Sequence, residues 1–171
     1  MVFRRKVKML AAAAVIGTLS GAAHALSTDR DEPILIEARS AEADNKAQVT
    51  IYRGDVVITQ GTLRITGDTV WIHYSDSNTI TKAISVGTPA KFRQLPDGKD
   101  DYMTADAERM EYIADQDLIH LIGNARYGEG ADKITAPRID YDSRLGRAKA
   151  GPDAAGGGSG KVRITITPKK K

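Results

Sequence analysis

The chain has 171 residues, and its 41% hydrophobic and 27% charged residues are a balance typical of a globular domain. Its formal net charge of +3 arises at the ends, since Arg4, Arg5, Lys6 and Lys8 precede residue 25 and three lysines occupy 169–171. The part between the ends has no basic excess, so no nucleic-acid partner is expected. The even spread of apolar residues also argues against a disordered chain or a coiled coil.

Residues 1–25 have the pattern of a secretory signal peptide. A basic segment ending at Lys8 precedes an apolar, alanine-rich segment that is too short for a stable membrane anchor. Ala23 and Ala25 provide the small residues required for cleavage between Ala25 and Leu26. An uncleaved anchor is the alternative. We therefore expect an exported protein, and because the sequence contains no cysteine, its fold has no disulfides.

Residues 26–168 are predicted to form one domain, followed by a basic tail at 169–171. Apolar residues recur there with a period of two, which is typical of β-strands. Gly, Asp and Asn interrupt the runs, as in Arg53-Gly54-Asp55, and predict hairpin turns in an all-β chain. Residues 150–160 are glycine-rich and predict a flexible link to a last strand. The clearest runs are 34–37, 49–53, 63–66, 70–74 and 162–167.

A shift of 69 residues superposes two parts of the chain. Gly54 then falls on Gly123, and Gly61 falls on Gly130. Two copies of one multi-stranded unit explain this match. Residues 105–114 have helical propensity, but they superpose on the extended stretch 36–45, so we predict a strand there.

The same shift predicts which side of each strand is apolar. Val56 and Ile58 superpose on Ala125 and Tyr127, whereas the residues between them are mixed or polar. A slip of one residue would turn a strand over, so the two copies must agree. We expect an antiparallel sheet with one apolar and one polar face, and Trp71 is predicted on the polar face.

The sequence offers little catalytic chemistry. His73 and His120 are the only histidines beyond the signal peptide, and neither a cysteine nor a Gly-x-Ser-x-Gly motif is present. A zinc site usually needs three or four ligands, and a nucleophile needs a base beside it. We expect no enzyme, no metal site and no cofactor.

Two interpretations of the apolar face follow from the residues alone. It could fill the closed core of an exported structural or carbohydrate-binding β-sandwich. Alternatively, it could line a slot open to lipid. Carbohydrate sites usually expose aromatic residues, which make up only 5% of this chain.

Several blocks of the sequence resemble the LptA family of periplasmic lipopolysaccharide transport proteins, which have an OstA-type fold. The matching blocks extend over most of the chain beyond the signal peptide. They are 32–37, 52–65, 87–94, 121–125 and 160–163.

The resemblance implies a twisted, open β-jelly roll of about sixteen antiparallel strands built from two tandem repeats. It implies a periplasmic protein that shelters the acyl chains of lipopolysaccharide (lipid A) in an apolar groove. Copies would stack head to tail and bridge the inner and outer membranes for outer-membrane assembly. The further partners implied are an LptC-like inner-membrane protein and the N-terminal domain of an LptD-like outer-membrane protein.

The resemblance and the alternation together predict the residues of the groove and of the docking edges. Edge strands can template a neighbouring chain by strand addition. The predicted groove residues are Ile34, Ile36, Tyr52, Ile58, Leu63, Ile65, Ile72, Phe92, Met110, Tyr112, Ile119, Leu121 and Tyr141. The predicted edge residues are Ile34, Ile36, Arg39, Val162, Ile164 and Ile166.

Overall fold

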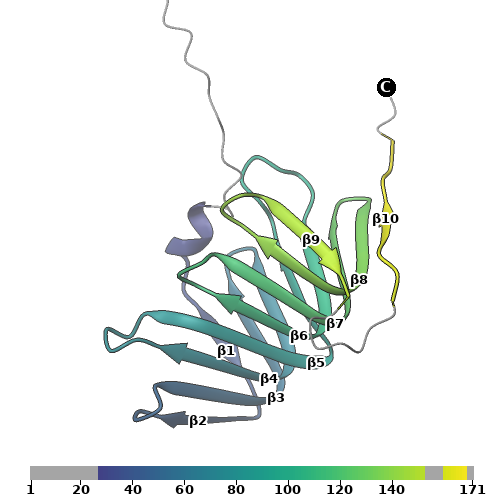
Figure 1. Ribbon diagram of the computed structural model, residues 1–171. Coiled ribbons are helices and arrows are strands. Elements are labelled where there is room, and N and C mark those ends of the chain that lie inside the picture. Colours follow the sequence, from purple (N-terminus) through teal and green to yellow (C-terminus); the bar gives the residue numbers. More distant parts are fainter. Residues whose placement is uncertain (1–26, 153–159, 169–171) are drawn as a thin grey trace, which may run out of the picture.

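The computed structural model describes residues 27–152 and 160–168. The predicted signal peptide and cleavage site, most of the glycine-rich segment and the tail 169–171 lie outside the described residues. The described chain forms one antiparallel sheet of ten strands after a short 3-10 helix (Figure 1). The elements are η1 (Ser27–Asp31), β1 (Leu35–Glu37), β2 (Ser40–Asp44), β3 (Val49–Gln60), β4 (Leu63–Tyr74), β5 (Ile80–Gln94), β6 (Met103–Ile113), β7 (Leu118–Glu129), β8 (Asp132–Asp142), β9 (Arg147–Gly151) and β10 (Arg163–Thr165).

Strands β3 to β8 pair with one another in chain order, as consecutive hairpins. Two short strands form each edge: β1 and β2 pair with different parts of β3, and β9 and β10 pair with different parts of β8. The sheet twists from β2 and β3 at the bottom of Figure 1 to β8 and β10 at its right. The all-β prediction is confirmed, and the segment predicted as strand despite its helical propensity is β6.

The long strands bend near their middle. In β3 the pairing with β4 shifts between Arg53 and Val56, where Gly54 has φ 84° and Asp55 has φ 49°. Glycine adopts this left-handed conformation freely, and aspartate tolerates it. Pairing resumes on both sides, so the extra residues form a bulge that bends the strand without ending it. Comparable shifts follow Thr66 in β4, Val86 in β5, Asp106 in β6 and Ile122 in β7.

The structure differs from two of the expectations stated above. Residues 53–55 are predicted as a hairpin turn, but they lie inside β3 as its bulge. About sixteen strands are expected, whereas ten are described. The first difference arises because the hydrogen-bonded ladder continues through positions that predicted a turn, whereas the count of about sixteen is implied by the resemblance and is not confirmed by the described strands.

Residues 69 positions apart have matching partners in the sheet. Strand β3 pairs with β4 from Val49 opposite His73, and β7 pairs with β8 from Leu118 opposite Asp142. The turn glycines Gly61 and Gly130 have φ 55° and 59°. The offset of 69 residues that relates the glycines in the sequence therefore also relates the β3–β4 pairing to the β7–β8 pairing in the sheet.

Two apolar clusters form the core, on one side of the sheet. The smaller belongs to β3 and β4, the larger to β5–β8, and Ile65 packs against both. The smaller cluster contains Val56, Ile58, Val70 and Ile72. The larger contains Ala90, Ala105, Ala107, Met110, Leu121, Ala125, Ala136 and Ile139.

The 3-10 helix is fastened to the β3–β4 turn by Asp29, which is only 4% exposed. Its carboxylate accepts hydrogen bonds from the backbone N–H and the hydroxyl of Thr62, both at 2.7 Å, and from Gln94 at 3.0 Å. Burial raises the pKa of Asp29, but these hydrogen bonds outweigh burial and hold the pKa below its ordinary value.

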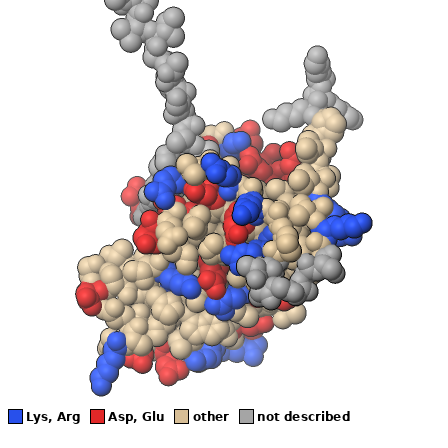
Figure 2. All heavy atoms as spheres, viewed as in Figure 1, with Lys and Arg blue, Asp and Glu red and all other residues tan. Residues whose placement is uncertain are grey.

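The opposite side of the sheet, which we call the polar face, carries ion pairs within a strand and between neighbouring strands, although apolar residues such as Ile51 and Ile84 also lie on it. Glu111 binds Arg109 at 2.6 Å and Lys82 at 3.1 Å. Burial raises the pKa of Glu111, but the hydrogen bonds from the two cations lower it further than burial raises it. Farther along the sheet, His120 Nδ1 lies 2.6 Å from Asp140. Basic and acidic side chains are likewise interspersed on the face of the molecule shown in Figure 2.

Candidate functional site

The apolar side of the sheet, which we call the inner face, consists of three rows of side chains that cross the strands. Cross-strand partners project from the same side of a sheet, so the register assigns each residue to a row. No charged residue occurs in these rows. The first contains Thr50, Ile72, Ala83, Tyr112, Ile119, Tyr141 and Ala148. The second contains Tyr52, Val70, Ser85, Met110, Leu121, Ile139 and Ala150. The third contains Ile36, Ile58, Ile65, Phe92, Ala105, Tyr127, Ile134 and Ile164.

The inner face is buried along its centre and partly accessible toward its rims. Leu121 and Ile139 in the second row are 1% and 0% exposed. Near the bends, Ala125 is also fully buried. Tyr112 in the first row is 37% exposed, and Phe92 in the third row is half-buried. The face therefore combines a packed floor with accessible apolar margins.

The structure places twelve of the thirteen predicted groove residues on strands and on this face, in the three rows or, for Leu63, two residues before Ile65. Ile34 precedes β1 and is 50% exposed. Of the twelve, Ile58, Ile72, Met110 and Leu121 are buried in the core clusters. The others are half-buried, apart from the exposed Tyr112.

The list of predicted groove residues omits Tyr127 and Ile134, which also lie on the inner face. Both pack against the larger core cluster, and the Tyr127 ring stacks on that of Tyr141, with 5.2 Å between the ring centroids. The 69-residue shift contains the signal for both residues, because it superposes them on Ile58 and Ile65. Burial, together with the nearby Tyr141 hydroxyl, raises the pKa of Tyr127, so its hydroxyl stays neutral at physiological pH.

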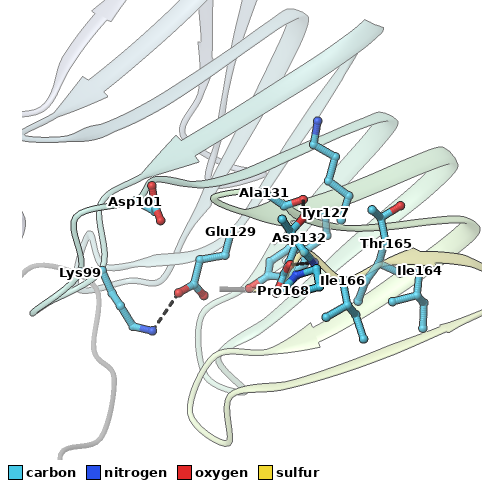
Figure 3. A pocket seen from close by; sticks show the side chains of 13 residues that line it. Lys99, Asp101, Tyr127, Glu129, Ala131, Asp132, Ile164, Thr165, Ile166 and Pro168 are labelled. Atoms are coloured by element: carbon cyan, nitrogen blue, oxygen red, sulfur yellow. Dashed lines mark hydrogen bonds and ion pairs between the residues drawn. The ribbon is translucent and has the colours of Figure 1, made fainter. Parts of the chain in front are cut away.

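A pocket of about 610 Å³ lies where the third row meets the C-terminal edge (Figure 3). Its apolar lining includes Tyr127, Ile134, Ile164 and Ile166. On its rim, Lys99 Nζ lies 2.8 Å from Glu129. Since the first three of these apolar residues are successive partners in the third row, the inner face continues into this pocket and reaches the edge of the sheet.

Both edges of the sheet expose apolar side chains. Leu35 and Ile34 are 58% and 50% exposed at the β1 edge, while Ile164 and Ile166 are 62% and 75% exposed at the β10 edge. Isolated edge strands with apolar side chains are sites where another chain can add.

The predicted edge residues lie at these two ends. Ile36 belongs to β1 and is half-buried, and Val162 is 40% exposed beside β10. Arg39 lies between β1 and β2, where its backbone N–H donates to the carbonyls of Arg53 and Gly54 and its side chain pairs with Asp55. The predicted last strand at 162–167 is shorter in the structure, where β10 spans three residues.

The described residues hold no group of three or more His, Cys, Asp and Glu side chains that could bind a metal ion. His120 is hydrogen-bonded to Asp140 beside Arg138 on the polar face. Of the helices in the described part of the chain, none has the length and apolar character needed to cross a membrane. The three rows of the inner face offer mainly apolar contact, together with the hydroxyl groups of Thr50, Ser85 and the tyrosines.

Comparison with known proteins gives one consistent result. Residues 35–147 match the model of the family described as LptA/(LptD N-terminal domain) LPS transport protein. This match begins at the first residue of β1 and ends at the first residue of β9.

Relatives with established names agree with the family match. The chain is 34% identical over 155 residues to the lipopolysaccharide export system protein LptH of Pseudomonas aeruginosa, covering 89% of each chain. It is 30% identical over 149 residues to LptA of Haemophilus influenzae, covering 85% of this chain and 82% of that one. The crystal structure of P. aeruginosa LptH superposes with a TM-score of 0.74 at 31% identity, covering 82% of this chain and 99% of the other.

Proposed function

The chain belongs to the LptA/LptD N-terminal domain family of lipopolysaccharide transport proteins, and from this premise we propose that it carries lipopolysaccharide across the periplasm by sheltering the acyl chains against its inner face. The relatives are export-system proteins, and the proposed role requires no catalysis. It agrees with the predicted signal peptide, which would deliver the chain to the periplasm.

The observation that supports the proposal best is the inner face, whose three rows contain no charged residue and whose margins are accessible. Transfer of each acyl methylene out of water is worth about 0.8 kcal/mol, so a lipid in transit needs continuous apolar contact. Tyr112 and Phe92 offer such contact at the two margins, while Leu121 and Ile139 form a floor that keeps water out. No specific chemistry is needed to hold an acyl chain there.

The open edges support the second part of the proposal, in which copies add head to tail. The β1 edge of one copy would pair with the β10 edge of the next, so that backbone N–H and C=O groups satisfy one another. A head-to-tail contact need not close into a ring, so it can build a filament. The LptC-like and LptD-like proteins would use the same edges at the two ends of the filament.

Photocrosslinking tests the acyl site. A photoreactive residue at Tyr112 or Ile36 should capture lipopolysaccharide, whereas the same residue at Trp71 should not. Trp71 is a suitable control because it is aromatic and half-buried like several inner-face residues, yet its partners Ile51 and Ile84 place it on the opposite side of the sheet. Capture at Trp71 alone would reverse the assignment of the faces.

The absence of capture at every inner-face position would favour the alternative of an exported structural or carbohydrate-binding β-sandwich with a closed core. A cellular experiment is independent of that outcome. Depletion of the protein should leave newly made lipopolysaccharide at the inner membrane, and normal delivery to the outer membrane would contradict the transport role.

The edge contact has its own test. Ile164→Asp places a charge at an exposed edge position that pairs with Ile134. We expect it to shorten the assemblies seen by light scattering while leaving the circular dichroism spectrum unchanged. A matched control is Leu145→Asp, since Leu145 is 61% exposed outside the edge strands. Equal assembly of both variants would argue against the edge contact.

A further inference from the structure

A second pocket, of about 500 Å³, lies over β4–β7, and its polar lining comes from the side of the sheet opposite to the inner face. Its charged lining is mainly basic. We call the cluster of Arg64, Lys91, Arg93 and Arg126 the basic groove. Asp106 is the one acidic residue that lines this pocket, and the hydroxyl-bearing residues Thr66 and Thr104 lie beside the four cations.

The register places these four side chains in two adjacent rows. Arg64 is directly opposite Arg93, and that row continues to Thr104. In the next row, Lys91 is opposite Asp106, which is opposite Arg126. Directly opposed side chains of like charge destabilise a sheet. The pairing of Arg64 with Arg93 is therefore unfavourable, and an anion between them would relieve the repulsion.

The cations of the groove are poorly neutralised within the described part of the chain. Asp106 lies 3.3 Å from Arg126, and Arg93 lies over the ring of Tyr102 at 5.1 Å from its centroid. No ion pair with an acidic side chain joins Arg64, Lys91 or Arg93 among the described residues. Elsewhere on the same side of the sheet, Glu111 is shared by Arg109 and Lys82. The groove thus carries four cations against one acidic side chain.

We propose that the basic groove binds a phosphorylated sugar. Guanidinium groups match phosphate oxygens with two parallel hydrogen bonds, and the opposed Arg64 and Arg93 could share one phosphate. The Thr66 and Thr104 hydroxyls can donate to and accept from sugar hydroxyls. A volume of about 500 Å³ lies within the usual range for a small-molecule site. The stacking of Arg93 on Tyr102 holds its guanidinium in place for binding.

The four cations project from the side of the sheet opposite to the inner face, although Phe92 and Ala105 of the third row also line the pocket. This site goes beyond the proposed function and does not depend on it. The sugar phosphate could belong to the head group of a lipid or to a free metabolite. Both sources present the same chemistry to the groove, and they are distinguished by experiment.

Isothermal titration calorimetry tests the proposal with three probes: glucose 1-phosphate, the bis-phosphorylated glucosamine disaccharide without acyl chains, and inorganic phosphate. We expect the double variant Arg64→Gln with Arg93→Gln to weaken sugar phosphate binding at least tenfold. The matched control, Arg147→Gln with Lys149→Gln, removes the same charge from β9 and should leave the affinity within twofold.

The three probes separate the sources. Tighter binding of the disaccharide than of glucose 1-phosphate assigns the groove to a lipid head group, and the reverse assigns it to a free sugar phosphate. Equal affinity for inorganic phosphate and glucose 1-phosphate overturns the assignment to a sugar. An equal loss in the two double variants, or no binding of any probe, overturns the site altogether.

The outcome can be separated from that of the acyl site. The Arg64→Gln and Arg93→Gln variant, carrying the photoreactive residue at Tyr112, should still capture lipopolysaccharide and keep its circular dichroism spectrum. If this variant still captures lipopolysaccharide and its affinity for sugar phosphate is unchanged, the basic groove is refuted and the acyl site is not. Loss of the circular dichroism spectrum would indicate that the double variant is unfolded. In that case the single variant Lys91→Gln tests the groove, and we expect it to weaken sugar phosphate binding about threefold to tenfold.

Discussion

Residues 35–74 and 104–143, which we call the first and second units, have the same strand pairing but different packing. Their bulges are related by the 69-residue offset, and Gly54 and Gly123 have φ 84° and 80°. Their cores differ: the first unit contributes four buried β-branched residues, whereas the second contributes many alanines with Met110, Leu121 and Ile139. The pairing of the strands is therefore the same in the two units although different side chains form their cores.

The sizes of directly opposed residues are distributed differently in the two units. At the bend, Val56 is opposite Gly67 in the first unit, and Ala125 is opposite Ala136 in the second. In the third row, Ile36 and Ile58 are opposite each other, as are Ala105 and Tyr127. Because interiors are close-packed, a larger residue on one strand is accommodated by a smaller one on its neighbour.

Leu121→Ala is expected to have the largest effect on stability. Leu121 is 1% exposed, and removing it leaves a cavity, which should lower the free energy of unfolding by about 3 kcal/mol. The equivalent Tyr52 is half-buried, so Tyr52→Leu, which introduces the second unit's residue, should cost about 1 kcal/mol. Urea unfolding measures both. A loss for Tyr52→Leu as large as that for Leu121→Ala would contradict the weaker packing expected at the half-buried Tyr52.

Ala125→Val tests whether a larger residue is accommodated by a smaller one on the neighbouring strand. Ala125 is 0% exposed and faces Ala136, so the added methyl groups should cost about 2 kcal/mol through overpacking. Adding Ala136→Gly recreates the Val56 and Gly67 pair of the first unit and should recover about 1 kcal/mol of that loss, which a double-mutant cycle would measure. Purely additive losses would contradict compensation across the bend.

Asp29→Ala tests a contact at the hairpin turn of the first unit. This contact is separate from the strand pairing that the two units share. The loss of its hydrogen bonds to Thr62 and Gln94 should cost about 1.5 kcal/mol at neutral pH. Since the pKa of Asp29 is lower in the folded state, the contribution is present above its ordinary value of 3.8 and disappears as the pH falls through the folded pKa. Wild type and variant should thus converge in acid. A constant difference down to about pH 2 would contradict this linkage.

The smallest effects are expected at Arg39 and Glu108, which occupy equivalent positions beside the two bulges. Arg39 pairs with Asp55, and Glu108 accepts a hydrogen bond of 2.6 Å from Asn124. Both Arg39 and Asp55 are highly exposed, so Arg39→Ala should change the unfolding free energy by about 0.5 kcal/mol or less. Glu108→Ala should behave similarly. A loss above about 1 kcal/mol at either site would assign these side chains a role in setting the bulge.

Much of the fold could be predicted because it rests on local patterns. The alternation of apolar residues fixes the side of the sheet on which a residue lies, and the 69-residue offset between glycines aligns the two units. Both signals assign Trp71 to the polar side and Tyr112 to the apolar side, where the register places them. The bends could not be predicted in the same way, because Gly54 and Asp55 suit a turn as well as a bulge.

The sequence by itself determined the all-β class and the sidedness of the strands, since both depend on the alternation of apolar and polar side chains. Only the tertiary structure decided which residues of the apolar side are accessible. Leu121 and Tyr112 share that side, but one is 1% exposed and the other 37%, because burial depends on what the bent strands bring near each residue. The tertiary structure also placed Arg64 opposite Arg93, since residues on different strands meet only after the sheet has formed.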